Sequence, residues 1–138
     1  MQATPPAPTI LTETVRRALS EDIDRGDITT EACIEPTVFG EATLNAREPV
    51  VVCGLPILEE VFGQVDLLVD VETHVQDGDL VEAGTSLATL SGPATSILLG
   101  ERVALNFLQR LTGVATMTRR FVDALPDGSV TRITDTRK

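Results

Sequence analysis

The spacing of apolar residues changes twice along this chain, and the change fixes the order of its structural elements. Apolar side chains recur every three to four positions in residues 10–19, alternate strictly with polar ones in residues 41–47, and return to helical spacing beyond residue 100. A period near 3.6 is typical of an amphipathic helix, and a period of two is typical of a half-buried strand. The sequence therefore predicts a helix, a sheet and further helices, which is an α/β fold.

Glycine, proline and short polar side chains mark where the first predicted elements begin and end. The first helix begins near Ile10 and ends before Gly26, which can adopt the left-handed conformation that stops a helix. The short side chains of Asp27 to Thr30 can bond to nearby backbone, so we expect a turn or a cap there. Pro56, at a first helical position, opens a second, short helix.

Strands are predicted at 41–47, where apolar and polar residues alternate, and at 50–53, where every residue is apolar. Several short strands follow between Val65 and Leu99, which favours a small sandwich or half-barrel. Glycine turns separate them at 76–79, 82–85 and 91–94. His74 is the only histidine and has no cysteine nearby, so it is assigned a surface or structural role.

Helical spacing returns beyond Gly100 and is interrupted once, at Thr112–Gly113. We therefore expect two helices, the second ending near Leu125, followed by a turn at 126–129 and a strand over 130–135. A strand needs a partner strand and a covering helix. Because neither follows, we expect this sequence to be a fragment of a longer protein.

The amino-acid composition excludes several classes of protein. With 138 residues, 42% of them hydrophobic, the chain can bury one core. No apolar run approaches the roughly 20 residues of a membrane-spanning helix, and the N-terminal residues lack the pattern of a signal peptide. Cys33 and Cys53 are unclustered, so we expect reduced, structural cysteines and no zinc site. These features predict a soluble protein that has no contact with membrane.

Charge is distributed unevenly. Residues 1–98 contain 4 basic and 17 acidic side chains, a net charge of −13, whereas residues 99–138 contain 7 basic and 4 acidic ones, a net charge of +3. An acidic chain with 3% aromatic residues has neither the basic stripe nor the stacking surface that nucleic acid requires. A small anionic ligand near the C-terminal segment remains open, and so does simple pairing of its cations with the acidic remainder.

Two groups of cations are candidates for anion binding. Arg137 and Lys138 follow a predicted strand, where α/β folds present ligand-binding groups, although they could also be two surface cations. Arg102 follows Glu101 at the predicted start of a helix, where its charge opposes the helix dipole. Either Glu101 and another acid compensate for that charge, or Arg102 binds an anion beside the helix N-terminus.

Three segments carry a more specific signal: EDIDRGDITT at 21–30, ERVALNFLQRLTGVAT at 101–116 and DTRK at 135–138. In sequence, order and spacing they resemble three signatures of the quinolinate phosphoribosyltransferases, also called carboxylating nicotinate-nucleotide pyrophosphorylases. The resemblance covers the chain from about Ile10 to Lys138. It implies a pentosyltransferase of de novo NAD biosynthesis, which converts quinolinate and phosphoribosyl pyrophosphate to nicotinate mononucleotide, carbon dioxide and pyrophosphate.

The resemblance also implies roles for individual residues. Arg102 reaches a quinolinate carboxylate in the neighbouring subunit of a homodimer, with Glu101 as a supporting acid. Thr136, Arg137 and Lys138 line the substrate, and Lys138 is the catalytic candidate. Mg²⁺ accompanies phosphoribosyl pyrophosphate in this family, and we expect no metal ligands in this chain.

The family's architecture divides the chain into a flexible arm at 1–9, an open-faced α/β sandwich at 10–112 and the first elements of an α/β barrel at 113–138. The acids that hold magnesium and the phosphate-binding loops would follow in the rest of the barrel. We therefore expect the chain alone to be inactive.

Other functions are also compatible with the sequence. A related molybdenum-associated group shares the fold, and a binding domain could keep the fold without the reaction. Residues 75–90 resemble the half-barrel of biotinyl and lipoyl carriers, but those carriers present a modified lysine on a hairpin. The only lysine here, Lys138, lies far outside that segment, which disfavours a carrier.

Overall fold

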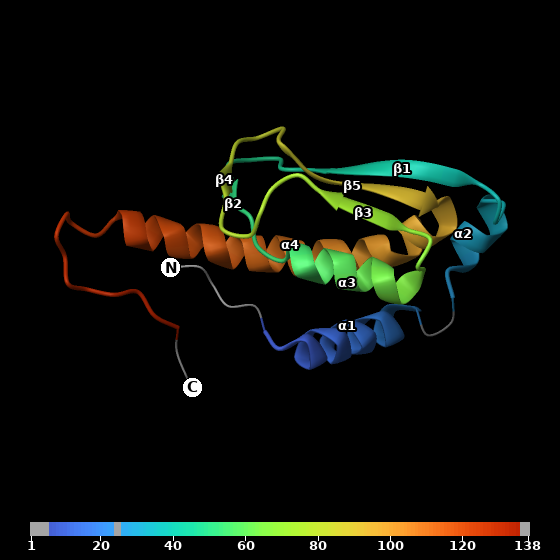
Figure 1. Ribbon diagram of the computed structural model, residues 1–138, viewed down its shortest axis with the longest axis horizontal. Coiled ribbons are helices and arrows are strands. Elements are labelled where there is room, and N and C mark those ends of the chain that lie inside the picture. Colours follow the sequence, from blue (N-terminus) through green and yellow to red (C-terminus); the bar gives the residue numbers. More distant parts are fainter. Residues whose placement is uncertain (1–5, 24–25, 136–138) are drawn as a thin grey trace.

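The computed structural model describes residues 6–23 and 26–135. Figure 1 shows a sheet above two helices, α3 and α4, with α1 below them. In chain order the elements are α1 (Pro8–Ile23), α2 (Ile28–Cys33), β1 (Phe39–Asn45), β2 (Val50–Val51), α3 (Leu55–Val65), β3 (Asp70–Thr73), β4 (Leu80–Val81), β5 (Ser86–Pro93) and α4 (Ala94–Asp123). The predicted mixture of helix and strand is confirmed.

The sheet is antiparallel and has the strand order β1-β5-β3. Thr89 of the central strand lies opposite Thr43 of β1 on one side and Glu72 of β3 on the other. Alternation within β1 directs Ala42 and Leu44 toward the core and leaves Thr43 exposed. Helices cover only one face of this sheet, so the fold is the open-faced sandwich that the resemblance implied. A second, two-stranded ladder joins β2 and β4.

The core lies between the sheet and the helical layer. Its largest fully buried side chains are Phe62, Val15, Val52 and Val61. Each such side chain contributes about 1.5–3 kcal/mol when it is removed from water. Because these residues come from α1, α3 and the segment after β2, the core joins parts of the chain that are distant in sequence.

A distant carboxylate caps the N-terminus of α3. Asp77 accepts hydrogen bonds from the backbone N–H groups of Gly54, at 2.9 Å, and Leu55, at 3.0 Å. These N–H groups have no partner within the helix, and a negative charge is favourable at this end of a helix dipole. Asp77 lies in the predicted glycine turn, which therefore holds α3 in place. The helix predicted at Pro56 is confirmed, with Pro56 in its first turn.

The two predicted C-terminal helices are one helix. α4 runs without a break from Ala94 to Asp123, so the predicted interruption at Thr112–Gly113 is wrong. The Thr112 hydroxyl accepts a hydrogen bond from the N–H of Cys53 and donates one to its carbonyl, both at 3.2 Å. Thr116 accepts from the N–H of Val51 at 2.9 Å. These threonines attach the β2 segment to the side of α4 and do not cap a helix.

The predicted turn at 91–94 is also wrong. Ser91 to Pro93 end β5, and Ala94 begins α4 directly. Glycine is required at position 92 for another reason: a Cβ there would lie 2.9 Å from the carbonyl oxygen of Leu68 and from the Cα of Val69. Gly92 therefore allows two backbone segments to approach closely.

The strand predicted over 130–135 does not form, and Val130 is 96% exposed. A strand is stabilised by a hydrogen-bonded neighbour, and none of the described strands lies beside this segment. The predicted turn before it is present, because Ser129 N–H donates to the Pro126 carbonyl at 3.0 Å.

The cap predicted at Asp27 to Thr30 is confirmed, and it opens a short helix, α2, that the sequence did not predict. The Asp27 carboxylate accepts hydrogen bonds from the hydroxyl and the backbone N–H of Thr30. These bonds lower the pKa of Asp27, with smaller contributions from the Thr29 N–H and the charge of Arg102, and against the effect of desolvation.

The approach of α4 to α3 can be tested at Gly100. A Cβ at this position would lie 2.7 Å from the Cε1 atom of Phe62, a residue that is only 2% exposed. We expect Gly100→Ala to lower the free energy of unfolding by about 1–3 kcal/mol through overpacking. Gly113→Ala is the control, because it lies in the same helix with no atom within 4 Å. It should stabilise the chain by about 0.5–1 kcal/mol.

Urea denaturation of the two variants and the parent chain measures both effects. If both substitutions changed stability in the same direction, the close contact between Gly100 and Phe62 would not limit the packing of α4.

The cap of α2 predicts a pH dependence. Because the pKa of Asp27 is lowered below its ordinary value of 3.8, ionised Asp27 stabilises the fold above that value, and this contribution is lost as the pH falls through the lower folded-state pKa. Asparagine also caps helices but has no charge to lose. Thermal unfolding of the parent and Asp27→Asn between about pH 7 and pH 2 should show a Tm difference that narrows at acidic pH. A difference that is constant with pH would contradict this assignment.

Candidate functional site

Arg102 lies within α4 and not at its N-terminus. The helix begins at Ala94, so Arg102 is about two turns inside it. The predicted conflict between this cation and the helix dipole at the helix start is therefore wrong, because the dipole effect fades within the first turn. Another interaction must account for the position of the side chain.

That interaction is an ion pair with Asp22 of α1. The Nη1 atom of Arg102 donates a hydrogen bond to Oδ1 of Asp22 at 3.2 Å. The side chain of Arg102 is 76% exposed, whereas that of Asp22 is 26% exposed. The Asp22 side chain is thus the less exposed partner, and most of the Arg102 side chain faces solvent. The compensating acid is Asp22, and Glu101 forms no ion pair with any residue in 6–23 or 26–135.

The packing of α1 places Asp22 opposite α4. Val15 and Leu19 are buried on one face of the helix, and Asp22 follows Leu19 after three residues, on the same face. Helix spacing therefore directs the carboxylate toward the surface that the two apolar residues cover.

The packing of α4 fixes the backbone of Arg102, as the packing of α1 fixes that of Asp22. Gly100 before it contacts Phe62, and Val103 and Ala104 after it are buried. Asp27, at the start of α2, contributes a second nearby negative charge, since Arg102 helps to lower its pKa. The fold thus brings the 21–30 segment beside the start of the 101–116 segment, which are two of the three motifs noted in the sequence.

The third motif cannot be placed. Thr136, Arg137 and Lys138 lie outside the described residues, so their predicted positions around a substrate stay predictions. His74, by contrast, is on the exposed side of the sheet. Its Nε2 atom lies 2.8 Å from the hydroxyl of Thr89, which agrees with a surface role.

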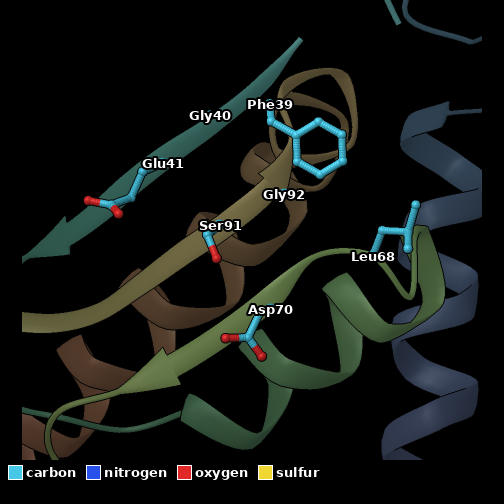
Figure 2. Close-up of a pocket in the computed structure, with 7 residues that line it drawn as sticks. All are labelled: Phe39, Gly40, Glu41, Leu68, Asp70, Ser91 and Gly92. Atoms are coloured by element: carbon cyan, nitrogen blue, oxygen red, sulfur yellow. The ribbon is translucent and has the colours of Figure 1, made fainter. Parts of the chain in front are cut away.

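A shallow hollow at one end of the open sheet face is the main alternative to the Arg102 region (Figure 2). Glu41, Ser91 and Asp70 form a row across β1, β5 and β3, and Phe39 and Leu68 flank its end. Two carboxylates and no cation line this hollow. Such a surface repels anions, so it does not suit a dicarboxylate or a phosphate.

Neither a metal cluster nor a membrane-spanning segment is found in the described part of the chain. No group of three or more His, Cys, Asp and Glu side chains that could hold a metal ion is found there. None of the helices there is long and apolar enough to cross a membrane. Cys33 and Cys53 are both free thiols, and burial, followed by the charge of Asp77, raises the pKa of Cys53.

Comparison with known proteins identifies the family. Residues 27–112 match the family model described as the N-terminal domain of quinolinate phosphoribosyl transferase. Quinolinate phosphoribosyltransferase 1 of Nicotiana glauca is 40% identical over 125 residues, which is 90% of this chain and 35% of the relative. The chloroplastic nicotinate-nucleotide pyrophosphorylase of Oryza sativa is 44% identical over 123 residues, which is 87% of this chain and 33% of the relative.

The solved structures agree with this assignment. NadC from Streptococcus pyogenes superposes with a TM-score of 0.86 at 35% identity, over 91% of this chain and 45% of that one. The chain thus spans about a third of the length of the two plant relatives and less than half of the solved one. The matched residues contain both Asp27 and Arg102, and the chain belongs to the quinolinate phosphoribosyltransferase family through its N-terminal domain.

Proposed function

We propose that this chain forms the N-terminal part of an enzyme that transfers a phosphoribosyl group from phosphoribosyl pyrophosphate to quinolinate. The products are nicotinate mononucleotide, carbon dioxide and pyrophosphate, as in de novo NAD biosynthesis. One observation carries the proposal: within a domain that matches this family, the Arg102 side chain is paired with Asp22 through Nη1 and is otherwise largely exposed. The names of the relatives favour this activity over a molybdenum-associated protein.

The chemistry of Arg102 suits a carboxylate of quinolinate. A guanidinium has five N–H donors in a planar fork, and only one hydrogen bond, to Asp22, engages it among the described residues. The other donors can form paired, charge-assisted bonds to a carboxylate. Glu101, exposed beside Arg102, would act as a supporting acid that limits the affinity for other anions.

A single arginine is not sufficient for this substrate. Quinolinate carries two carboxylates and the leaving group is pyrophosphate, so several cations are needed around them. We assign these cations to Arg137 and Lys138, with Lys138 as the catalytic candidate and Thr136 as a neutral substrate-lining residue, and to further residues of the full-length enzyme. Mg²⁺ would accompany phosphoribosyl pyrophosphate and would be held by those further residues.

The proposed enzyme is a homodimer, in which Arg102 of one subunit binds the substrate in the active site of its partner. Three large apolar residues on one face of α4, Val114, Met117 and Phe121, are exposed, and they offer a surface for contact with more protein. The compartment is proposed as cytoplasmic.

Removal of Arg102 tests the assignment. In a full-length enzyme that carries this chain as its N-terminal part, Arg102→Ala should weaken quinolinate binding by about 1.5–3 kcal/mol, more than tenfold, through loss of a charge-assisted hydrogen bond. The KM for quinolinate should rise, while circular dichroism shows an intact fold because no core residue has changed. An unchanged KM would contradict the assignment.

Exchange of subunits tests the role across the interface. Two variant enzymes, one with Arg102→Ala and the other with Lys138→Ala, are mixed and allowed to exchange, and activity is measured at a quinolinate concentration well below the KM of the Arg102→Ala variant, where both parents have little activity. If Arg102 serves the partner's site, each mixed dimer has one intact site, and about a quarter of wild-type activity should return after random exchange. If Arg102 serves the site of its own subunit, every site keeps a defect and no activity returns.

A further inference from the structure

We infer that Asp22 is a positioning residue for Arg102, which holds the guanidinium in the orientation that binds the substrate carboxylate. This inference rests on the proposed function of Arg102. The two residues are separated by most of the domain in sequence, and the packing of α1 on the helical layer brings them together. Figure 1 shows α1 running beneath that layer.

The first argument is that Asp22 occupies an unfavourable position within its own helix. It lies in the last turn of α1, where the helix dipole is negative and carboxylates are disfavoured. No basic residue lies in that turn. The helix α1 itself therefore gives an acid at this position little electrostatic stabilisation. Its partner among the described residues is Arg102, and local rules of this kind are broken most often at functional sites.

The second argument is the asymmetry of the ion pair. Surface ion pairs contribute little to stability, because long exposed side chains lose entropy when they are fixed. Here the acid is the less exposed partner, and its short side chain projects from a helix anchored by Val15 and Leu19. The pair therefore serves mainly to limit the motion of the longer side chain, that of Arg102.

The third argument concerns the donors that remain. Asp22 engages Nη1 with a single bond, so it fixes the direction of the guanidinium and leaves the other N–H groups for a ligand. Ordering a flexible side chain before the ligand arrives lowers the cost of binding. Loss of Asp22 should therefore weaken quinolinate binding and leave the rate of the bound complex largely unchanged.

A double-mutant cycle in the full-length enzyme tests this inference. Asp22→Ala should raise the KM for quinolinate about three- to tenfold, with kcat and the KM for phosphoribosyl pyrophosphate nearly unchanged. Asp22→Asn keeps an acceptor oxygen and should restore part of the loss. In the Arg102→Ala background, Asp22→Ala should have no further effect, because there is no guanidinium left to position.

Glu21→Ala is the matched control. Glu21 lies at the same negative end of α1 and forms no ion pair with any residue in the described ranges, so its removal should leave both KM values unchanged. Thermal unfolding of every variant reports the state of the fold.

The outcomes separate the two proposals. If Arg102→Ala leaves the KM for quinolinate unchanged, the proposed function of Arg102 is wrong. If Arg102→Ala raises that KM but Asp22→Ala does not, only the positioning role is wrong. If Asp22→Ala causes the same loss with and without Arg102, Asp22 has a structural role and the inference is overturned.

Discussion

The contact between Gly100 and Phe62 sets the position of α4, and the candidate site depends on that position. Because glycine has no side chain, α4 approaches α3 closely enough for the ring of Phe62 to fill the gap. β5 leads into α4 without a loop, so the sheet, α3 and α4 form one packed unit. Arg102 follows Gly100 by two residues, and the contact that determines helix packing therefore also determines where the guanidinium leaves the surface.

The strand β1 and the start of α3 were predictable, because their signals are local. Alternation at 41–47 and Pro56 each depend on a few neighbouring residues, and the structure has β1 and α3 at these places. The continuity of α4 was not predictable in the same way. Thr112 and Gly113 are weak helix formers, but the hydroxyl of Thr112 bonds to Cys53, which is 59 residues away in sequence. A tertiary contact of this kind overrides local propensity.

The candidate site, too, depends on tertiary contacts that the sequence alone does not reveal. The sequence indicated Arg102 through its family motif, but the reason first given for its importance, a place at the helix start, was wrong, because the helix begins eight residues earlier, at Ala94. Asp22 was not identified as a site residue, although its spacing would have placed it on the same face of α1 as the buried Val15 and Leu19. Its partner lies 80 residues further along the chain, and only the folded structure pairs them.

The charges around Arg102 indicate that this domain would form only part of a quinolinate-binding site, the rest of which comes from another surface. Asp22 and Asp27 both lie close to the guanidinium, and residues 1–98 carry a net charge of −13. The net field of these residues therefore repels a dianion, and a single arginine cannot neutralise two carboxylates. In the inference drawn above, Asp22 orients the arginine through its hydrogen bond to Nη1, and Asp27 contributes only a further negative charge nearby. Under the proposed function, tight binding of quinolinate therefore requires further cations from another surface.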